Sequence, residues 1–176
     1  FVSYHQDAKY IGLEPLNWVT AWVAITDSNE HNGCMRMWAG SHKDNLKQHD
    51  QKFNEGNLLT RGQTVKDVPI EETTPLILTA GQMSLHHPTV VHGSDLNKSD
   101  DRRIGFVIQS YIGSNVKQVL GKNGVQLARG KDDYNFHEII ERPKSLMDKK
   151  DLKIKKQEND NLQEIFYKGS SKKGAY

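Results

Sequence analysis

The sequence predicts a mainly β domain, a sandwich or a barrel, followed by a helical C-terminal extension. Short runs rich in β-branched and aromatic residues recur between turn signals, which is typical of sandwiches and barrels. Residues 137–167 are highly charged, have few apolar positions and show a helical pattern. The 176 residues are enough for a hydrophobic core. We therefore expect a β core over residues 1–115 and a charged, partly helical extension over residues 116–176, packing on the core or on a partner.

The first half of the core is expected to contain three strands. Residues 1–8 favour a short strand, and a loop follows it. Residues 18–25 are apolar at both parities, which is typical of a strand buried on both faces. Asn32-Gly33 is a strong hairpin signal, so residues 34–38 are expected to pair back as the next strand.

The second half of the core begins with a long polar segment, residues 43–75. Such an excursion inside a compact domain is usually a functional lid or loop, and we expect it on the substrate side. Extended segments are expected at residues 76–79, 82–87 and 89–92. Residues 103–112 alternate cleanly between polar and apolar and predict a further strand.

The alternation in residues 103–112 predicts two different faces. Arg103 and Val107 share one face, and Ile104, Phe106 and Ile108 share the other. If Arg103 faces a ligand cavity, the apolar face needs a cover. The candidates are the C-terminal segment, a segment missing before residue 1 and a second copy of the chain. We expect a homo-oligomer.

Composition excludes several classes of protein. The 24 basic and 22 acidic residues nearly balance, so nothing points to a nucleic-acid partner. No apolar run has membrane-spanning length. Cys34 is the single cysteine, so no intramolecular disulfide is possible and a reducing compartment, the cytoplasm, is expected.

A His-x-Asp triplet suggests a metal site. His5 and Asp7 lie two residues apart on the first expected strand, so their side chains share a face. A second imidazole from another strand would complete the two-His, one-carboxylate set of non-haem Fe(II) oxygenases. His86 and His92 both qualify. The triplet alone is weak evidence, because such triplets arise often by chance.

The joint pattern of several blocks is more specific. It resembles the phytanoyl-CoA dioxygenase (PhyH) family over roughly residues 4–111, with block order and spacing kept. The blocks are His5 to Tyr10, Trp22, Asn32 to Arg36, Gly40 to His42, Gly81 to His86, His92 to Ser99, and Arg103-Ile104. The resemblance implies a double-stranded β-helix, a jelly-roll and cupin-like fold. It also implies Fe(II), the co-substrates 2-oxoglutarate and O2, and a small-molecule substrate that is hydroxylated as 2-oxoglutarate is converted to succinate and CO2.

The resemblance also implies roles for individual residues. It makes His5, Asp7 and His92 the iron ligands, and it disfavours His86, which lacks the following Gly-Ser and the Arg spacing. In halogenating relatives a small residue replaces the carboxylate, so Asp7 implies hydroxylation.

Four further residues are expected in the co-substrate pocket. Arg103 stands where the family places the arginine that holds the distal carboxylate of 2-oxoglutarate, and a guanidinium fork binds a carboxylate bidentately. Its neighbour Arg102 has the opposite parity and is read as a solvated charge. Ser94 stands where a hydroxyl contacts the co-substrate, and Gln6 and Trp22 are expected to line the same pocket.

Two other classes of function remain open. One is a cupin-like metal protein that does not use 2-oxoglutarate, such as an isomerase. The other is a non-catalytic, truncated binding module, because family members carry a substantial region before the His-x-Asp strand and only four residues precede His5 here. The fold is accordingly expected to be incomplete at its N-terminus.

Overall fold

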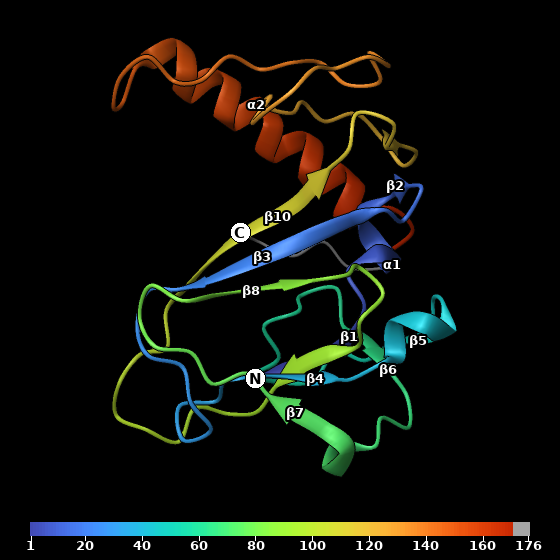
Figure 1. Ribbon diagram of the computed structural model, residues 1–176, viewed down its shortest axis with the longest axis vertical. Coiled ribbons are helices and arrows are strands. Elements are labelled where there is room, and N and C mark those ends of the chain that lie inside the picture. Colours follow the sequence, from blue (N-terminus) through green and yellow to red (C-terminus); the bar gives the residue numbers. More distant parts are fainter. Residues whose placement is uncertain (171–176) are drawn as a thin grey trace.

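Two facing β-sheets form the body of the computed structural model, which describes residues 1–170 (Figure 1). The strands are β1 (Val2–His5), β3 (Trp18–Ala24), β4 (Met35–Trp38), β7 (Thr73–Pro75), β8 (Met83–His86), β9 (His92–Ser94) and β10 (Gly105–Ile112). One sheet has the order β1-β9-β4-β7 and the other the order β10-β3-β8, with antiparallel neighbours throughout. The mainly β prediction is confirmed.

The space between the sheets is filled from β3 and β4. Trp22 and Ala24 of β3 pack against Met35 of β4, and the three residues are buried. The outward-facing Val19 and Val23 of β3 are only partly buried. The prediction that β3 is buried on both faces is therefore wrong for its outer face.

The expected hairpin around Asn32-Gly33 does not form. β4 pairs with β7 and β9, whereas β3 pairs with β8 and β10, so residues 25–34 carry the chain from one sheet to the other. The turn itself is real: Gly33 has φ 74°, and a Cβ there would lie 2.7 Å from the carbonyl oxygen of Asp95. The local signal predicted a turn correctly, but turn chemistry does not say which strands pair across it.

The polar segment 43–75 is more ordered than predicted. It contains the antiparallel pair β5 (His49–Gln51) and β6 (Gln63–Val65), and β7 at its end replaces the strand expected at residues 76–79. Two short 3-10 turns, Ser41–Asp44 and Ile70–Glu72, lie on either side of the β5–β6 pair. The segment is attached to β1, because the Ser3 hydroxyl donates to the Gln63 carbonyl (3.1 Å).

The segment after residue 115 packs on the core. Strand β11 (Lys117–Gln118) pairs with β2 (Leu13–Glu14), and Val116 joins a buried cluster with Leu13 and Trp18, against which Phe166 also packs. The boundary at residue 115 stays a prediction.

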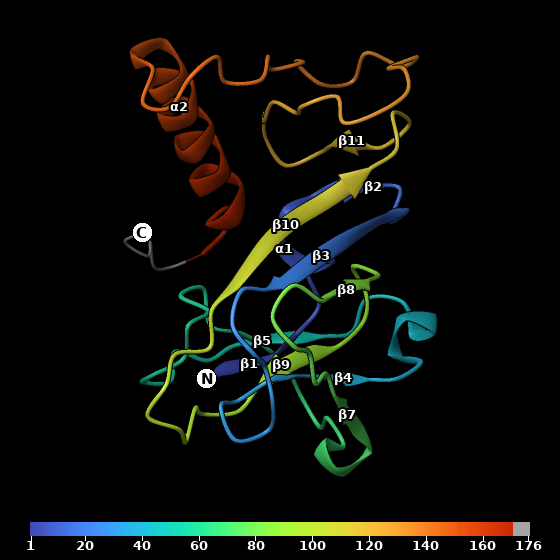
Figure 2. The same cartoon turned by 60° about the vertical axis from the view of Figure 1, so that its left-hand side comes forward.

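The C-terminal helix α2 (Lys149–Phe166) lies on the side of β10 away from the four-stranded sheet (Figures 1 and 2). Asp148 caps it by accepting from the backbone N–H groups of Lys150 and Asp151, so the helix begins later than the expected residue 137. Residues 171–176 of the expected extension lie outside the described residues. None of the helices in the described part of the chain has the length and apolarity that a membrane crossing requires.

The outer face of the β10-β3-β8 sheet stays exposed. Phe106 is 59% exposed, Leu85 60% and Met83 58%. The C-terminal segment, one of the candidate covers, reaches only the far end of β10, where Ile139 and Leu162 line the same cavity as Ile108. Phe166 of this segment also meets Tyr10 of α1 (Ala8–Ile11) edge to face.

Candidate metal centre

Two imidazoles meet at one end of the β1–β9 strand pair. His5 and His92 are direct partners in the register, and their ring centroids lie 4.2 Å apart. His5 Nδ1 lies 2.8 Å from the Ser3 carbonyl oxygen, and His92 Nδ1 lies 2.9 Å from that of Val90. Because a carbonyl only accepts, each Nδ1 carries the proton and each Nε2 has a free lone pair. Both rings are therefore prepared to bind a metal ion through Nε2.

Asp7 supplies the carboxylate, although it does not lie on the strand as predicted. β1 ends at His5, and Asp7 is the residue immediately before α1, with helical backbone angles. Its side chain still reaches the two imidazoles: Oδ1 lies 3.6 Å from His5 Nε2 and 3.8 Å from His92 Nε2. One ligand atom from each of the three residues lies within 4.8 Å of the other two, and all three residues are buried. The Tyr10 hydroxyl donates to Oδ1 at 3.1 Å.

The charge states of this cluster suit a cation. Burial lowers the pKa of His92 to about 3, helped by the nearby His5, so this imidazole is neutral at neutral pH. Burial acts to raise the pKa of Asp7, but the imidazoles of His5, His86 and His92 outweigh it and hold that pKa well below its usual range. The result is one carboxylate beside neutral imidazole, which fits a divalent metal ion.

The competing histidine lies in the same cluster. His86 Nε2 is 3.5 Å from Asp7 Oδ2, and its ring centroid is 4.8 Å from that of His92. His86 therefore faces Oδ2 of Asp7, whereas His5 and His92 face Oδ1. The Thr20 hydroxyl donates to this same Oδ2 at 2.8 Å.

A cavity of about 220 Å³ opens beside the cluster. It is lined by the three ligand candidates and by Val2, Tyr10, Thr20, Trp22, Met35, Leu59, His86, Gly93, Ser94, Arg103, Val107 and Gln109. The expected pocket residues Arg103, Ser94 and Trp22 are thus brought together with the candidate ligands. Leu59 shows that the segment 43–75 reaches this cavity.

Arg103 is held over an aromatic ring. Its guanidinium carbon lies 5.5 Å from the centre of the Trp22 ring, within the range of a cation–π contact. Gly105 makes room for that ring, since a Cβ there would lie 2.0 Å from an indole carbon. Burial lowers the pKa of Arg103, and no hydrogen bond or ion pair to its side chain is found among residues 1–170. A partly buried guanidinium without an anionic partner is suited to receive a carboxylate.

Gln6 does not line the cavity, contrary to prediction. Its side chain is fully buried and bonds to backbone instead, donating to the carbonyls of Asn45 (2.9 Å) and Thr89 (2.6 Å) and accepting from the Lys47 N–H (2.7 Å). Gln6 lies between His5 and Asp7 in sequence, and its side chain points away from theirs. It therefore ties the cluster to neighbouring loops rather than to a ligand.

Sequence reasoning missed the groups that surround Asp7. Thr20 shares the parity of Trp22 on β3, so the same alternation rule would have placed it in the cavity. Tyr10 lies three residues after Asp7, and the short helix α1 brings its hydroxyl back to Asp7, whereas the sequence predicts a loop there. Gln109 has the strand parity of Arg103 and Val107 and also lines the cavity.

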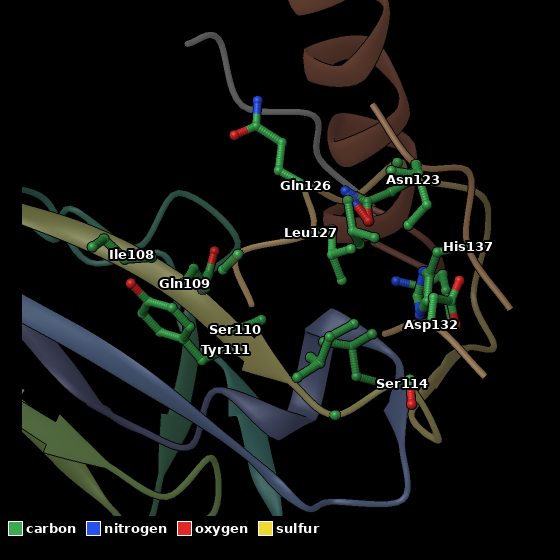
Figure 3. Close-up of a pocket in the computed structure, with 18 of the residues that line it drawn as sticks. Ile108, Gln109, Ser110, Tyr111, Ser114, Asn123, Gln126, Leu127, Asp132 and His137 are labelled. Carbon is green, nitrogen blue, oxygen red and sulfur yellow. The ribbon is translucent and has the colours of Figure 1, made fainter. Parts of the chain in front are cut away.

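A larger cavity, of about 560 Å³, lies apart from the cluster. Figure 3 shows its lining, with Ile108 to Tyr111 of β10 on one side and Asn123, Leu127 and His137 on the other. It shares Gln109 with the smaller cavity but contains none of the candidate metal ligands.

Two facing β-sheets that place two imidazoles and a carboxylate around one point have the donor set that mononuclear non-haem iron proteins use. Within that class, the sequence profile described as phytanoyl-CoA dioxygenase (PhyH) matches residues 2–105. The chain belongs to this family.

Individual relatives agree with this assignment. The peroxisomal phytanoyl-CoA dioxygenase of Mus musculus is 31% identical over 122 residues, which cover 68% of this chain and 36% of that protein. The chain thus spans about a third of the length of this curated relative.

Solved structures extend the likeness beyond the family profile. The non-heme monooxygenase ThoJ in its apo form superposes with a TM-score of 0.81 at 30% identity, covering 94% of this chain and 60% of ThoJ. Its nickel complex gives a TM-score of 0.71 at 29% identity, covering 93% of this chain and 58% of ThoJ. EvdO2 from Micromonospora carbonacea var. aurantiaca, complexed with 2-oxoglutarate, shares the fold at 22% identity and a TM-score of 0.51, over 60% of this chain and 43% of EvdO2.

Proposed function

We propose that this chain carries the catalytic site of an Fe(II)- and 2-oxoglutarate-dependent dioxygenase that hydroxylates a small organic substrate. The observation that carries the proposal is the convergence of His5, Asp7 and His92 at the wall of a cavity that also contains Arg103. Two imidazoles and one carboxylate are the donor set of non-haem Fe(II) oxygenases and leave other coordination positions open. Membership of the phytanoyl-CoA dioxygenase family supports the same assignment.

We also propose that the two sheets form a double-stranded β-helix. A double-stranded β-helix is supported by the interleaved strand orders β1-β9-β4-β7 and β10-β3-β8, in which the chain changes sheet from β3 to β4, from β8 to β9 and from β9 to β10. The ligand candidates from β1 and β9 and the arginine beside β10 then face one another across the two sheets.

Each residue has a definite task in this scheme. When bound, Fe(II) and 2-oxoglutarate supply the activation of O2, which couples oxidation of 2-oxoglutarate to succinate and CO2 with hydroxylation of a C–H bond. His5, Asp7 and His92 hold the ion. Arg103 binds the distal carboxylate of 2-oxoglutarate through its guanidinium fork and is kept in place by the Trp22 ring. Ser94 is buried at the cavity wall and offers a hydroxyl to the same co-substrate.

Measuring succinate and O2 together tests this function. The chain, supplied with Fe(II), 2-oxoglutarate and O2, is expected to form succinate slowly even without its primary substrate, and His92→Ala is expected to form none. Metal binding without any use of 2-oxoglutarate would support the cupin-like alternative. Failure to bind either would support a non-catalytic module. Because the chain spans only part of its relatives, the activity and substrate of the whole protein are part of the proposal.

A further inference from the structure

His86 is a buried imidazole whose polar atoms are unaccounted for. The residue is 6% exposed, and within residues 1–170 neither Nδ1 nor Nε2 has a hydrogen-bond partner. Leaving a buried polar group unpaired is destabilising, so most such groups in folded proteins have partners. A buried imidazole without a hydrogen-bond partner is therefore expected to have a role that the metal-free protein does not show.

The surroundings of Asp7 indicate that role. Oδ1 of Asp7 faces the Nε2 atoms of His5 and His92, so it is the oxygen placed to bind the metal ion. Oδ2 faces away from them, accepts from the Thr20 hydroxyl at 2.8 Å and lies 3.5 Å from His86 Nε2. The two oxygens of one carboxylate therefore have different neighbours.

We propose that His86 is a positioning residue for the metal centre, donating from Nε2 to Asp7 Oδ2 and so keeping Asp7 bound to the ion through Oδ1 alone. The proposal rests on the proposed function. A carboxylate with a free second oxygen can bind a metal ion through both, which would occupy a position that the co-substrate needs. Two donors on Oδ2, from Thr20 and His86, hold that oxygen. A contraction of the 3.5 Å distance by a few tenths of an ångström makes this hydrogen bond.

The geometry argues against His86 as a metal ligand. Within the described part of the chain, the group whose ligand atoms all approach one another is His5, Asp7 and His92. His86 approaches Asp7 from the Oδ2 side. Removing a group that hydrogen-bonds to a metal ligand typically lowers the metal affinity about 10–100-fold.

The test uses Co(II) as a spectroscopic probe with the full chain and without 2-oxoglutarate. His86→Phe removes the donor, whereas His86→Gln can place an amide N–H near the position of Nε2. We expect His86→Phe to weaken Co(II) binding on the order of tenfold and to change the visible ligand-field bands, and His86→Gln to restore both. The melting temperature of each metal-free variant is measured as well, so that a loss of Co(II) affinity is separated from a loss of folding. The same two substitutions at exposed His31 are the matched control.

The other outcomes separate the hypotheses. If both His86 variants keep the wild-type affinity and spectrum, the positioning role is wrong and the metal centre stands. If both abolish Co(II) binding while melting as wild type does, His86 is itself a ligand and the proposal is overturned. If wild type binds no Co(II), the proposed function fails, and this inference fails with it.

Discussion

His5 and His92 lie directly opposite each other in the antiparallel β1–β9 pair, and both rings are oriented by the same kind of local hydrogen bond. Each Nδ1 donates to the carbonyl two residues earlier in the chain, Ser3 for one and Val90 for the other. The two Nε2 atoms converge on Asp7. Strand register and backbone hydrogen bonds thus orient this half of the site.

This arrangement predicts that His92 is indispensable for metal binding and that His86 cannot replace it. His92→Ala should lower the affinity for Fe(II) by at least about 100-fold, since it removes one of three ligands. Isothermal titration under anaerobic conditions measures the effect. An exposed-histidine variant, His31→Ala, should bind as wild type does. Normal Fe(II) binding by His92→Ala would show that the ligand assignment is wrong.

A second prediction concerns acid stability and rests on His49. His49 Nε2 accepts the Gln6 N–H at 3.1 Å, and its Nδ1 donates to the Lys47 carbonyl at 2.9 Å, so the ring is held neutral. Burial lowers its pKa from 6.5 to about 4. The unfolded chain then binds this proton at a higher pH than the folded chain, so stability is lost as pH falls from 6.5 towards 4.

Urea unfolding of the metal-free chain at several pH values measures this loss. The His49 contribution between pH 7 and pH 5 is about 1 kcal/mol after allowance for its partial exposure. His49→Gln should flatten the curve by that amount and His31→Gln should not. Some acid dependence will remain in His49→Gln, because His92 titrates in the same direction with a pKa of about 3. An unchanged curve in His49→Gln would contradict the assignment.

A third prediction concerns self-association through the exposed sheet. Phe106, Val23 and Met83 are neighbours across three strands, and Leu85 adds a fourth apolar side chain to the same outer face. Apolar patches of this kind mark interaction surfaces, so we expect a homo-oligomer. Light scattering should give a mass above that of one chain, and Phe106→Lys should lower it. Ile77→Lys, at a residue that is 60% exposed outside this sheet, is the control. A monomeric wild type would refute the prediction.

The parts of the site that the sequence predicted depend on short-range rules. Alternation along a strand correctly placed Arg103 towards the cavity and Phe106 towards the outside. The same rule turns Gln6 away from His5, so only the resemblance to the family places Gln6 in the pocket. Asp7 converges with His5 as predicted, although its backbone is helical and not extended.

The parts that the sequence could not predict depend on long-range pairing. Asn32-Gly33 signals a turn whether the flanking strands pair with each other or enter different sheets, and here they enter different sheets. Tyr10 reaches Asp7 from the short helix α1, which the sequence does not predict. The 43–75 segment looked irregular because β5 and β6 are only three residues each.

The central claim is tested most directly by an anaerobic titration of the Fe(II)-loaded chain with 2-oxoglutarate, following the visible charge-transfer band of the Fe(II)–2-oxoglutarate chelate. We expect wild type to develop the band and His92→Ala to lack it. Arg103→Ala should require roughly 10–100-fold more 2-oxoglutarate, because a buried carboxylate loses its guanidinium partner. The matched control is Arg102→Ala, at the exposed neighbouring arginine, which should titrate as wild type does. Absence of the band in wild type, or equal titration of Arg103→Ala and wild type, would contradict the account.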